Sequence, residues 1–165
     1  MIEDEFDKIV GRPVVEEGEP IFDLASLDTV AGSDNGAEIA IVHPITKEPV
    51  GIYWTVLGKH SQVFRDIVKE RVDRRIKAEA AAAQKGKPLI PKTAEQAEQE
   101  AIELLAACSL GWRQEHNSAS KDTITYKKEE LIFNIPNALR ILREMLWIRE
   151  QVDEAIGDLE NFIKA

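Results

Sequence analysis

The stretch 37–61 constrains the fold most, because it combines two alternating apolar runs, a turn and a helix start. Residues 37–42 and 50–57 place apolar side chains at the two-residue period of a strand, and the two prolines between these runs suit a loop. Ser61 offers a side-chain oxygen to the free N–H groups at the start of a helix. The sequence therefore predicts a hairpin over 37–57 with a helix folded onto it.

Apolar spacing and helix-start signals predict helices at about 61–85, 93–109, 136–146 and 148–163. The first helix has apolar residues at every fourth position from Phe64, followed by an alanine-rich run with little to bury, so its second half should project from the core. Thr93 begins a capping-box pattern for the second helix. A shift in apolar phase between Met145 and Ile148 separates the last two helices. We expect the buried side of the second helix to consist of Ala97, Ala101, Leu104, Leu105 and Cys108.

The remaining segments are polar, short or irregular. Residues 1–19 are acidic and interrupted by glycine and proline, which predicts a flexible start. We expect residues 20–30 to pack on the hairpin through Ile21, Phe22, Leu24, Leu27 and Val30. Residues 113–121 are predicted to form a polar loop, and 122–133 a weak strand. Together these elements predict an α+β fold, with a small antiparallel sheet and a largely helical C-terminal half, as a single domain over 20–165.

Composition limits the classes of protein to consider. The chain has 165 residues, 44% hydrophobic and 31% charged, which is typical of a soluble domain with a modest core. Its net charge of -9 argues against a general nucleic-acid binder, since phosphate contacts need clustered cations. The first residues lack the basic and apolar regions of a signal peptide, and no apolar run approaches the roughly 20 residues that span a bilayer. With a single cysteine, these features predict a cytoplasmic protein without a disulfide framework.

Groups that carry chemistry are sparse in the sequence. None of His43, His60 and His116 has a second ligand at the spacing of a zinc or iron site, and turn or surface roles suit all three. Cys108 lies on an apolar helix face, where a small buried residue is expected. Phosphate-binding glycine motifs and the nucleophile elbow are missing. We therefore predict no catalytic residue, no metal site and no cofactor; the alternative is a hydrolase that uses His43 or His116.

The first predicted helix is locally basic. Its basic cluster consists of Arg71, Arg74, Arg75 and Lys77. They alternate with acidic residues, so an exposed helix face with ion pairs between its side chains is favoured over contact with a nucleic-acid backbone. Nucleic-acid binding through this helix is kept as an alternative.

The tryptophans indicate where apolar surface is in excess. Trp54 lies in a strand alternation and Trp112 follows a helix end, so we expect both in the core. Trp147 falls at the phase shift, where three consecutive large apolar residues cannot all face one core. This excess predicts a partner-binding surface made of Leu142, Leu146, Trp147, Ile148, Val152 and Ile156. The alternative is that all six form the core.

Two short motifs and the C-terminal part resemble the tail assembly chaperones encoded in tail gene clusters of long-tailed bacteriophages and prophages. The motifs are residues 43–49 (HPITKEP) and 56–61 (VLGKHS), followed by an arginine-bearing helix. Trp112, the entry at 134–142 and the ending 148–152 (IREQV) fit the same pattern. Lys47 departs from it, because it stands where the family has a Thr-Gly-Glu turn.

The resemblance implies a non-enzymatic helper in tail morphogenesis, in the cytoplasm of the host bacterium. Such chaperones bind the long, helical, hydrophobic tape-measure protein and the tail-tube protein, and they leave before the virion is finished. It implies neither a membrane nor a nucleic-acid partner, and it allows a homo-oligomer. The alternative role is a minor tail or neck subunit retained in the virion, with the 37–57 hairpin pairing edge to edge between copies.

Overall fold

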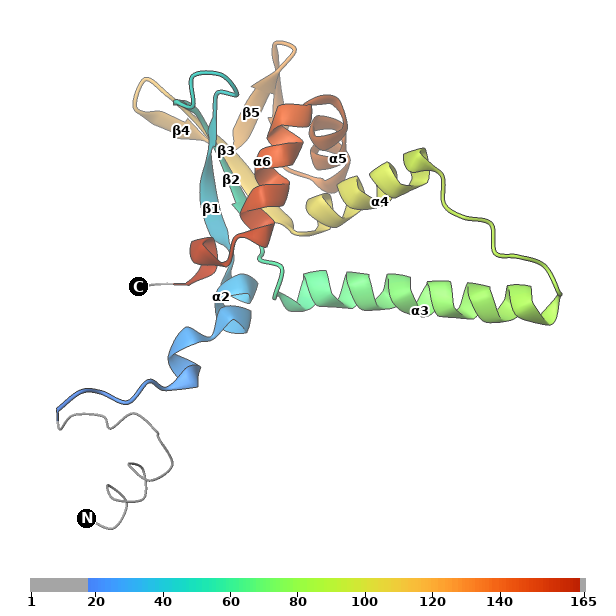
Figure 1. Ribbon diagram of the computed structural model, residues 1–165. Helices are drawn as coiled ribbons and strands as arrows, with labels where there is room; N and C mark the ends of the chain where they lie inside the picture. The colour runs from blue at the N-terminus through green and yellow to red at the C-terminus, as the bar shows by residue number, and fades with distance from the viewer. Residues whose placement is uncertain (1–17, 164–165) are drawn as a thin grey trace.

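The computed structural model describes residues 18–163, which form an α+β fold (Figure 1). In chain order the elements are η1 (Leu24–Leu27), α2 (Thr29–Asn35), β1 (Ala37–Val42), β2 (Pro49–Val56), α3 (Gln62–Gln84), α4 (Ala94–Ala107), β3 (Ser109–His116), β4 (Ala119–Lys121), β5 (Thr123–Tyr126), β6 (Glu129–Ile132), α5 (Ile135–Glu144), α6 (Leu146–Gly157) and η2 (Leu159–Phe162). No helix in this part of the chain combines the length and apolar character needed to cross a bilayer.

The predicted hairpin is confirmed and forms half of a larger sheet. The strands β1, β2, β3 and β4 pair antiparallel in that order, with Ala37 opposite Val56 at the open end of the hairpin. In the β1–β2 turn Lys47 has a φ of 64°, and its N–H donates to the carbonyl oxygen of His43 at 3.0 Å. The left-handed turn therefore forms without the glycine of the family pattern.

The predicted polar loop at 113–121 is wrong, because these residues lie in strands. β3 pairs with β2, and β4 returns along β3 after a two-residue turn in which Asn117 and Ser118 have φ values of 50° and 64°. The predicted weak strand at 122–133 is a second hairpin, β5–β6, whose turn residues Lys127 and Lys128 have φ values of 50° and 68°. Hairpin turns with two positive φ values usually carry Asn-Gly, so neither turn has the sequence signal that identifies one.

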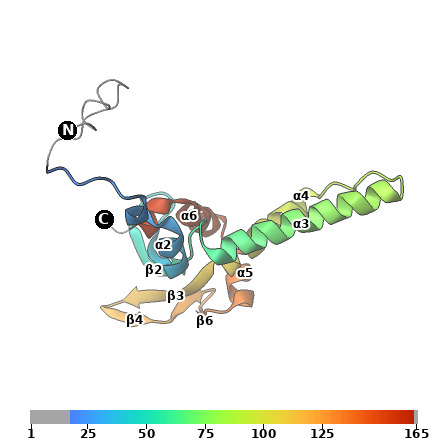
Figure 2. The same ribbon diagram turned by 90° about the horizontal axis from the view of Figure 1, so that it is seen from below.

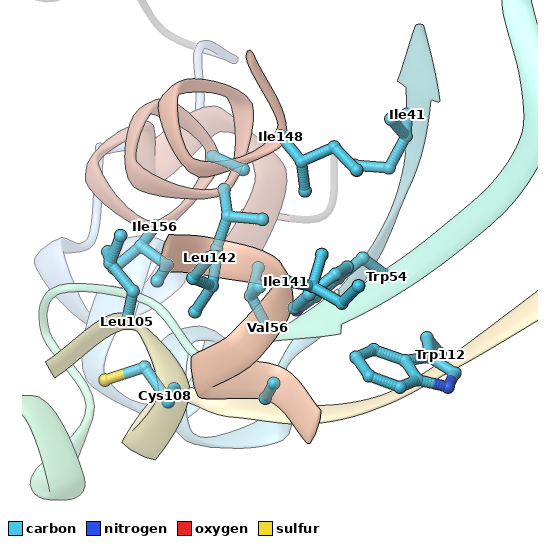
Figure 3. Close-up of a cluster of buried hydrophobic side chains, with 14 of the residues drawn as sticks. Ile41, Trp54, Val56, Leu105, Cys108, Trp112, Ile141, Leu142, Ile148 and Ile156 are labelled. Carbon is cyan, nitrogen blue, oxygen red and sulfur yellow. The ribbon is translucent and has the colours of Figure 1, made fainter. Parts of the chain in front are cut away.

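The core lies between the sheet and the helices α4, α5 and α6 (Figure 3). Trp54 and Trp112 face each other across β2 and β3, with ring centroids 5.0 Å apart and an interplanar angle of 65°. Each indole nitrogen has an acceptor: Trp54 Nε1 donates to Ser109 Oγ at 2.9 Å, and Trp112 Nε1 to the Leu131 carbonyl oxygen at 3.0 Å. Both tryptophans are therefore core residues, as predicted.

The predicted break between the C-terminal helices is confirmed at Met145, whose φ of -107° and ψ of 85° leave the helical region. Asn134 begins α5 by accepting a hydrogen bond from the Asn137 N–H at 2.8 Å, and Pro136 lies in the first turn. α6 ends at Gly157, and η2 follows, so the predicted single helix over 148–163 is shorter than expected.

The predicted packing of residues 20–30 on the hairpin is wrong. Their five large apolar side chains are 40–86% exposed. The contact with the rest of the protein is made instead by α2, where Gly32 lies so close to η2 that an added Cβ would be 1.9 Å from the Phe162 carbonyl oxygen. Ser33 accepts a backbone hydrogen bond from Gly58 at 3.1 Å. The flexible start predicted for 1–19 lies almost entirely outside the described residues.

The helix α3 projects away from the sheet and the core helices (Figures 1 and 2). Ser61 caps it as predicted, accepting a hydrogen bond from the Phe64 N–H at 3.2 Å. None of its 23 residues is buried; Phe64 in the first turn packs against the core, and the rest of the helix projects, including the predicted second half. The capping box at Thr93 is confirmed, but Ala97 and Ala101 of α4 are exposed, because the first half of α4 extends beyond the core on the same side as α3 (Figure 1).

Candidate functional site

The six residues predicted to bind a partner do not form one surface. Four of them are at most 5% exposed: Leu142, Ile148, Val152 and Ile156. Their helices α5 and α6 pack against the sheet and α4, which directs these side chains inward. Leu146 is 56% exposed and Trp147 is half-buried. Contact with a partner through the last two stays a prediction, whereas the other four are part of the core.

A row of exposed apolar residues lies on α3. Val68, Val72 and Ile76 are 40%, 50% and 57% exposed, and we call these three residues the apolar stripe. They follow one another at four-residue spacing on a helix that stands clear of the core. A solvent-exposed row of β-branched residues on one projecting helix is the kind of surface that a second helix can cover.

α3 is helical without burial because local interactions stabilise it. Arg74 pairs with Glu70 at 2.8 Å and Arg75 with Glu79 at 3.0 Å, each across one helical turn. Residues 78–83 carry five alanines, the residue type with the highest helix propensity. The helix can therefore present its side chains without the support of a second layer.

The start of α3 is fixed to the rest of the protein by specific contacts. Asp34 accepts a hydrogen bond from the Gln62 N–H at 2.7 Å. His60, just before the helix, shares a hydrogen bond of 2.7 Å with the Thr29 hydroxyl. Farther along, Arg71 donates to the Glu100 carbonyl oxygen of α4 at 2.8 Å. The direction of the helix is thus set by its first turns and by one contact to α4.

A groove of about 510 Å³ lies between residues 71–78 of α3 and residues 89–92 of the connection to α4, with Glu100 at its edge. We call it the cationic groove, because its lining contains Arg71, Arg74, Arg75 and Lys92. Its apolar lining consists of Ala78, Leu89, Ile90 and Pro91. Ile90 is 89% exposed. The groove combines positive charge with apolar surface, which are the properties that bind an acidic and apolar peptide segment.

The cations of α3 do not form a free basic row. Arg74 and Arg75 are paired with glutamates of the same helix, and Lys92 pairs with Glu100 at 2.6 Å. The hydrogen bond from Lys92 also lowers the pKa of Glu100. Because Arg74, Arg75 and Lys92 are paired with carboxylates, the face gives less support to nucleic-acid binding than the number of arginines indicates.

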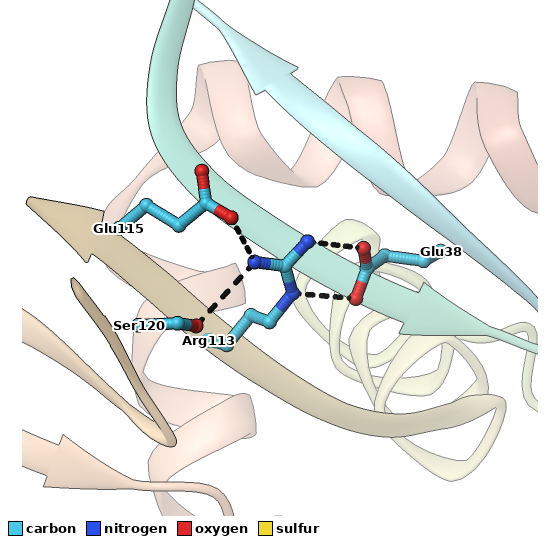
Figure 4. A network of polar contacts seen from close by, with 4 residues as sticks. All are labelled: Glu38, Arg113, Glu115 and Ser120. Carbon is cyan, nitrogen blue, oxygen red and sulfur yellow. Dashed lines mark hydrogen bonds and ion pairs between the residues drawn. The ribbon is translucent and has the colours of Figure 1, made fainter. Parts of the chain in front are cut away.

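A second polar cluster ties three strands together on the solvent-facing side of the sheet (Figure 4). Arg113 of β3 donates to both carboxylate oxygens of Glu38 on β1, at 2.6 and 2.9 Å. It also contacts Glu115 and, at 3.4 Å, the Ser120 hydroxyl of β4. The hydrogen bond from Arg113 lowers the pKa of Glu38, and the two carboxylates raise the pKa of Arg113. Because Arg113 has all its partners within the sheet, this cluster is a structural clamp.

The histidines and the cysteine have structural partners. His43 Nδ1 accepts from the backbone N–H groups of Ile45 and Thr46 at 3.1 and 3.2 Å, which closes the β1–β2 turn. Burial raises the pKa of the Cys108 thiol to about 11, so the reactive thiolate is scarce at neutral pH. Within residues 18–163, no three His, Cys, Asp or Glu side chains are grouped to hold a metal ion.

Comparisons with models of protein families, with curated proteins and with solved structures found no match to this chain. The fold and the surfaces described above are therefore the basis for a function.

The apolar stripe and the cationic groove were not identified as functional from the sequence. A signal for the stripe was present: from Val68 to Ile76 the spacing is always four residues, which advances about 40° around the helix at each step, because a turn has 3.6 residues. A helix that faces a core mixes spacings of three and four, which keeps its apolar residues on one side. The groove left no such signal, because Leu89 and Ile90 lie in an irregular connection.

Proposed function

We propose that the protein is a non-enzymatic tail assembly chaperone of a long-tailed bacteriophage or prophage, which binds the tape-measure protein during tail morphogenesis. Two independent observations support the proposal. The first is the resemblance of residues 43–49, 56–61 and 148–152 to this family. The second, which carries most weight, is the apolar stripe on a helix with no buried residue. A chaperone for a hydrophobic helical client needs an accessible apolar helix face of this kind.

The size of the stripe suits reversible binding. Val68 and Ile76 are eight residues apart, so the stripe runs about 12 Å along the helix. A client helix crossing it would bury an area well below the roughly 1,600 Å² of a standard stable interface. Small interfaces give short-lived complexes, which a helper that leaves before the particle is finished requires.

Co-expression with a fragment of the tape-measure protein encoded by the same phage or prophage tests the proposal. We expect the wild-type chain to co-purify with the fragment and Val72→Asp/Ile76→Asp to retain at most about a tenth as much, because each carboxylate would have to be desolvated at the contact. Ala81→Asp is a matched control on the opposite side of α3, at an exposed position with the same change of charge per site. Leu146→Asp tests the exposed part of the surface predicted from the sequence.

The outcomes separate the two surfaces. Loss of binding in the α3 variant alone places the client on the apolar stripe, and loss in Leu146→Asp alone places it at the start of α6. If the wild-type chain does not capture the fragment, or if neither variant lowers the tail yield of an induced prophage, the proposed function is wrong.

A structural tail or neck subunit is the alternative, and it depends on β1 as an open sheet edge. One end of this edge is occupied, because Gln151 of α6 accepts from the Val42 N–H at 2.9 Å and donates to the Val42 carbonyl oxygen at 2.8 Å. A second copy cannot pair with Val42 while Gln151 is bound there, which disfavours pairing along the whole strand. Mass spectrometry of purified virions distinguishes the two roles, since a retained subunit is present in the particle and a chaperone is not.

A further inference from the structure

The cationic groove is chemically unusual for this chain. Its lining has four cations and one carboxylate, Glu100, whereas the whole chain has a net charge of -9. Leu89 and Ile90 add apolar surface that is 41% and 89% exposed. The groove therefore complements a segment in which acidic residues alternate with large apolar ones.

The arginines of the groove can exchange their partners at low cost. Arg74 and Arg75 are held by Glu70 and Glu79, and these four side chains are 49–72% exposed. Ion pairs this exposed contribute little to stability, because water screens them and the long side chains lose entropy when they are fixed. A carboxylate from another segment can therefore replace Glu70 or Glu79 with only a small loss of helix stability.

The chain itself contains a segment with the complementary chemistry. Residues 19–28, EPIFDLASLD, contain three acidic residues and no basic one. Ile21, Phe22 and Leu24 are 86%, 64% and 83% exposed, which is a large amount of uncovered apolar surface for ten residues. We call residues 19–28 the acidic segment.

The fold directs the acidic segment away from the cationic groove of the same copy. Asp23 caps η1 by accepting from the Ala25 N–H, and Asp28 caps α2 by accepting from Val30 and Ala31. α2 is in turn fixed by the close approach of Gly32 to η2. The segment leaves the protein on the side opposite to the projecting end of α3 (Figures 1 and 2). Reaching its own groove would break both caps.

We propose that the acidic segment of one copy binds in the cationic groove of a second copy. Phe22 and Leu24 then contact Leu89 and Ile90, and the segment's carboxylates pair with the groove arginines. The two surfaces differ, so the contact is heterologous: each copy keeps a free segment at one end and a free groove at the other. Repetition of this contact gives a ring if the rotation closes and an open chain if it does not.

A mixing experiment tests this arrangement. The segment variant is Phe22→Ser/Leu24→Ser, and the groove variant is Arg75→Glu/Ile90→Ser. Lys121→Glu/Ile45→Ser is the matched control: Ile45 is 83% exposed and Lys121 is an exposed, ion-paired cation outside the groove. All the altered side chains are exposed, so far-UV circular dichroism should be unchanged.

Sedimentation velocity then gives a distinct pattern. We expect the wild-type chain and the control to associate with rising concentration, and each of the two variants alone to sediment as a monomer. A mixture of the two variants should form dimers with one copy of each and stop there, because the only intact groove meets the only intact segment. A monomeric wild-type chain, variants that associate like the wild type, or a mixture that stays monomeric would each overturn the proposal.

Salt provides a second readout. Since carboxylate–arginine pairs contribute to the contact, the association constant should fall about tenfold or more between about 0.1 M and 1 M salt. An association constant that is unchanged or rises with salt would contradict the assigned charge pairing.

The proposal does not depend on the chaperone function. The segment variant alters neither the apolar stripe nor the cationic groove, so it should capture a tape-measure fragment as the wild type does. If the wild-type chain captures the fragment but does not self-associate, only this inference is refuted. If it self-associates but does not capture the fragment, only the proposed function is refuted.

Discussion

Two helical regions of this protein have similar apolar content but differ in how far their apolar side chains are buried. In α5 and α6 most apolar residues are buried, and Leu142 and Val152 have no exposed surface. In α3 the residues Val68, Val72 and Ile76 are 40–57% exposed. The difference is what faces each helix: α4 packs against both α5 and α6, and the sheet packs against α6, whereas α3 makes few contacts, with α4 and α2.

The comparison shows that an apolar helix face does not by itself indicate a core. The excess of apolar residues around Trp147 predicted a partner-binding surface, and most of those residues are in the core. The apolar spacing in the helix at 61–85 predicted that only its second half projects from the core. The apolar stripe is instead exposed along its whole length. A partner site is therefore better sought where a helix has apolar residues but no layer opposite them.

The largest expected difference between the two regions comes from deleting one side chain in each. Trp54→Ala should lower the free energy of unfolding by about 3–5 kcal/mol, because it leaves a cavity beside Trp112 and removes the donor to Ser109. Ile76→Ala should change it by less than about 0.5 kcal/mol, because the side chain is already in water. Urea denaturation measures both; a similar loss in the two variants would show that α3 is covered in solution.

An intermediate loss of stability is expected from a change at the start of α3, where this helix joins the core. Ser61 is fully buried and caps α3, so Ser61→Ala should cost about 1 kcal/mol by leaving the Phe64 N–H without its acceptor. Hydrogen exchange should become faster in the first turn of α3 and stay slow in β2 and β3. Equal acceleration in the sheet would mean that the helix and the core unfold as one unit.

The smallest expected effect on stability comes from the clamp that Arg113 and Glu38 form on the sheet. Because the hydrogen bond from Arg113 lowers the pKa of Glu38 below its ordinary 4.5, the ionised carboxylate stabilises the folded state above that pH, and this contribution disappears as pH falls through the lowered pKa. Glu38→Gln should therefore be slightly less stable than the wild type near neutral pH and equal to it at an acidic pH below the lowered pKa. Denaturation midpoints at both pH values check this; a difference that persists in acid would assign the effect to packing.

Local signals in the sequence predicted several parts of the fold. The alternation in 37–42 and 50–57 identified the hairpin, and the caps at Ser61, Thr93 and Asn134 identified helix starts. The strands at 109–121 were missed, because β3 is specified by pairing with β2 and its turn lacks the usual Asn-Gly. The cationic groove was missed for the same kind of reason, since it is formed by residues about fifteen apart that meet only in the fold.

The sequence by itself determined which segments are strands and helices wherever period and capping act within a few residues, and it determined the chain's acidic charge. Only the tertiary structure decided which apolar faces are covered, because burial depends on what lies opposite a surface and not on the residues that form it. This difference in coverage distinguishes α6, whose apolar face is buried, from α3, whose apolar face is exposed. It places Trp147 at the margin of a core and leaves Val72 accessible to another protein.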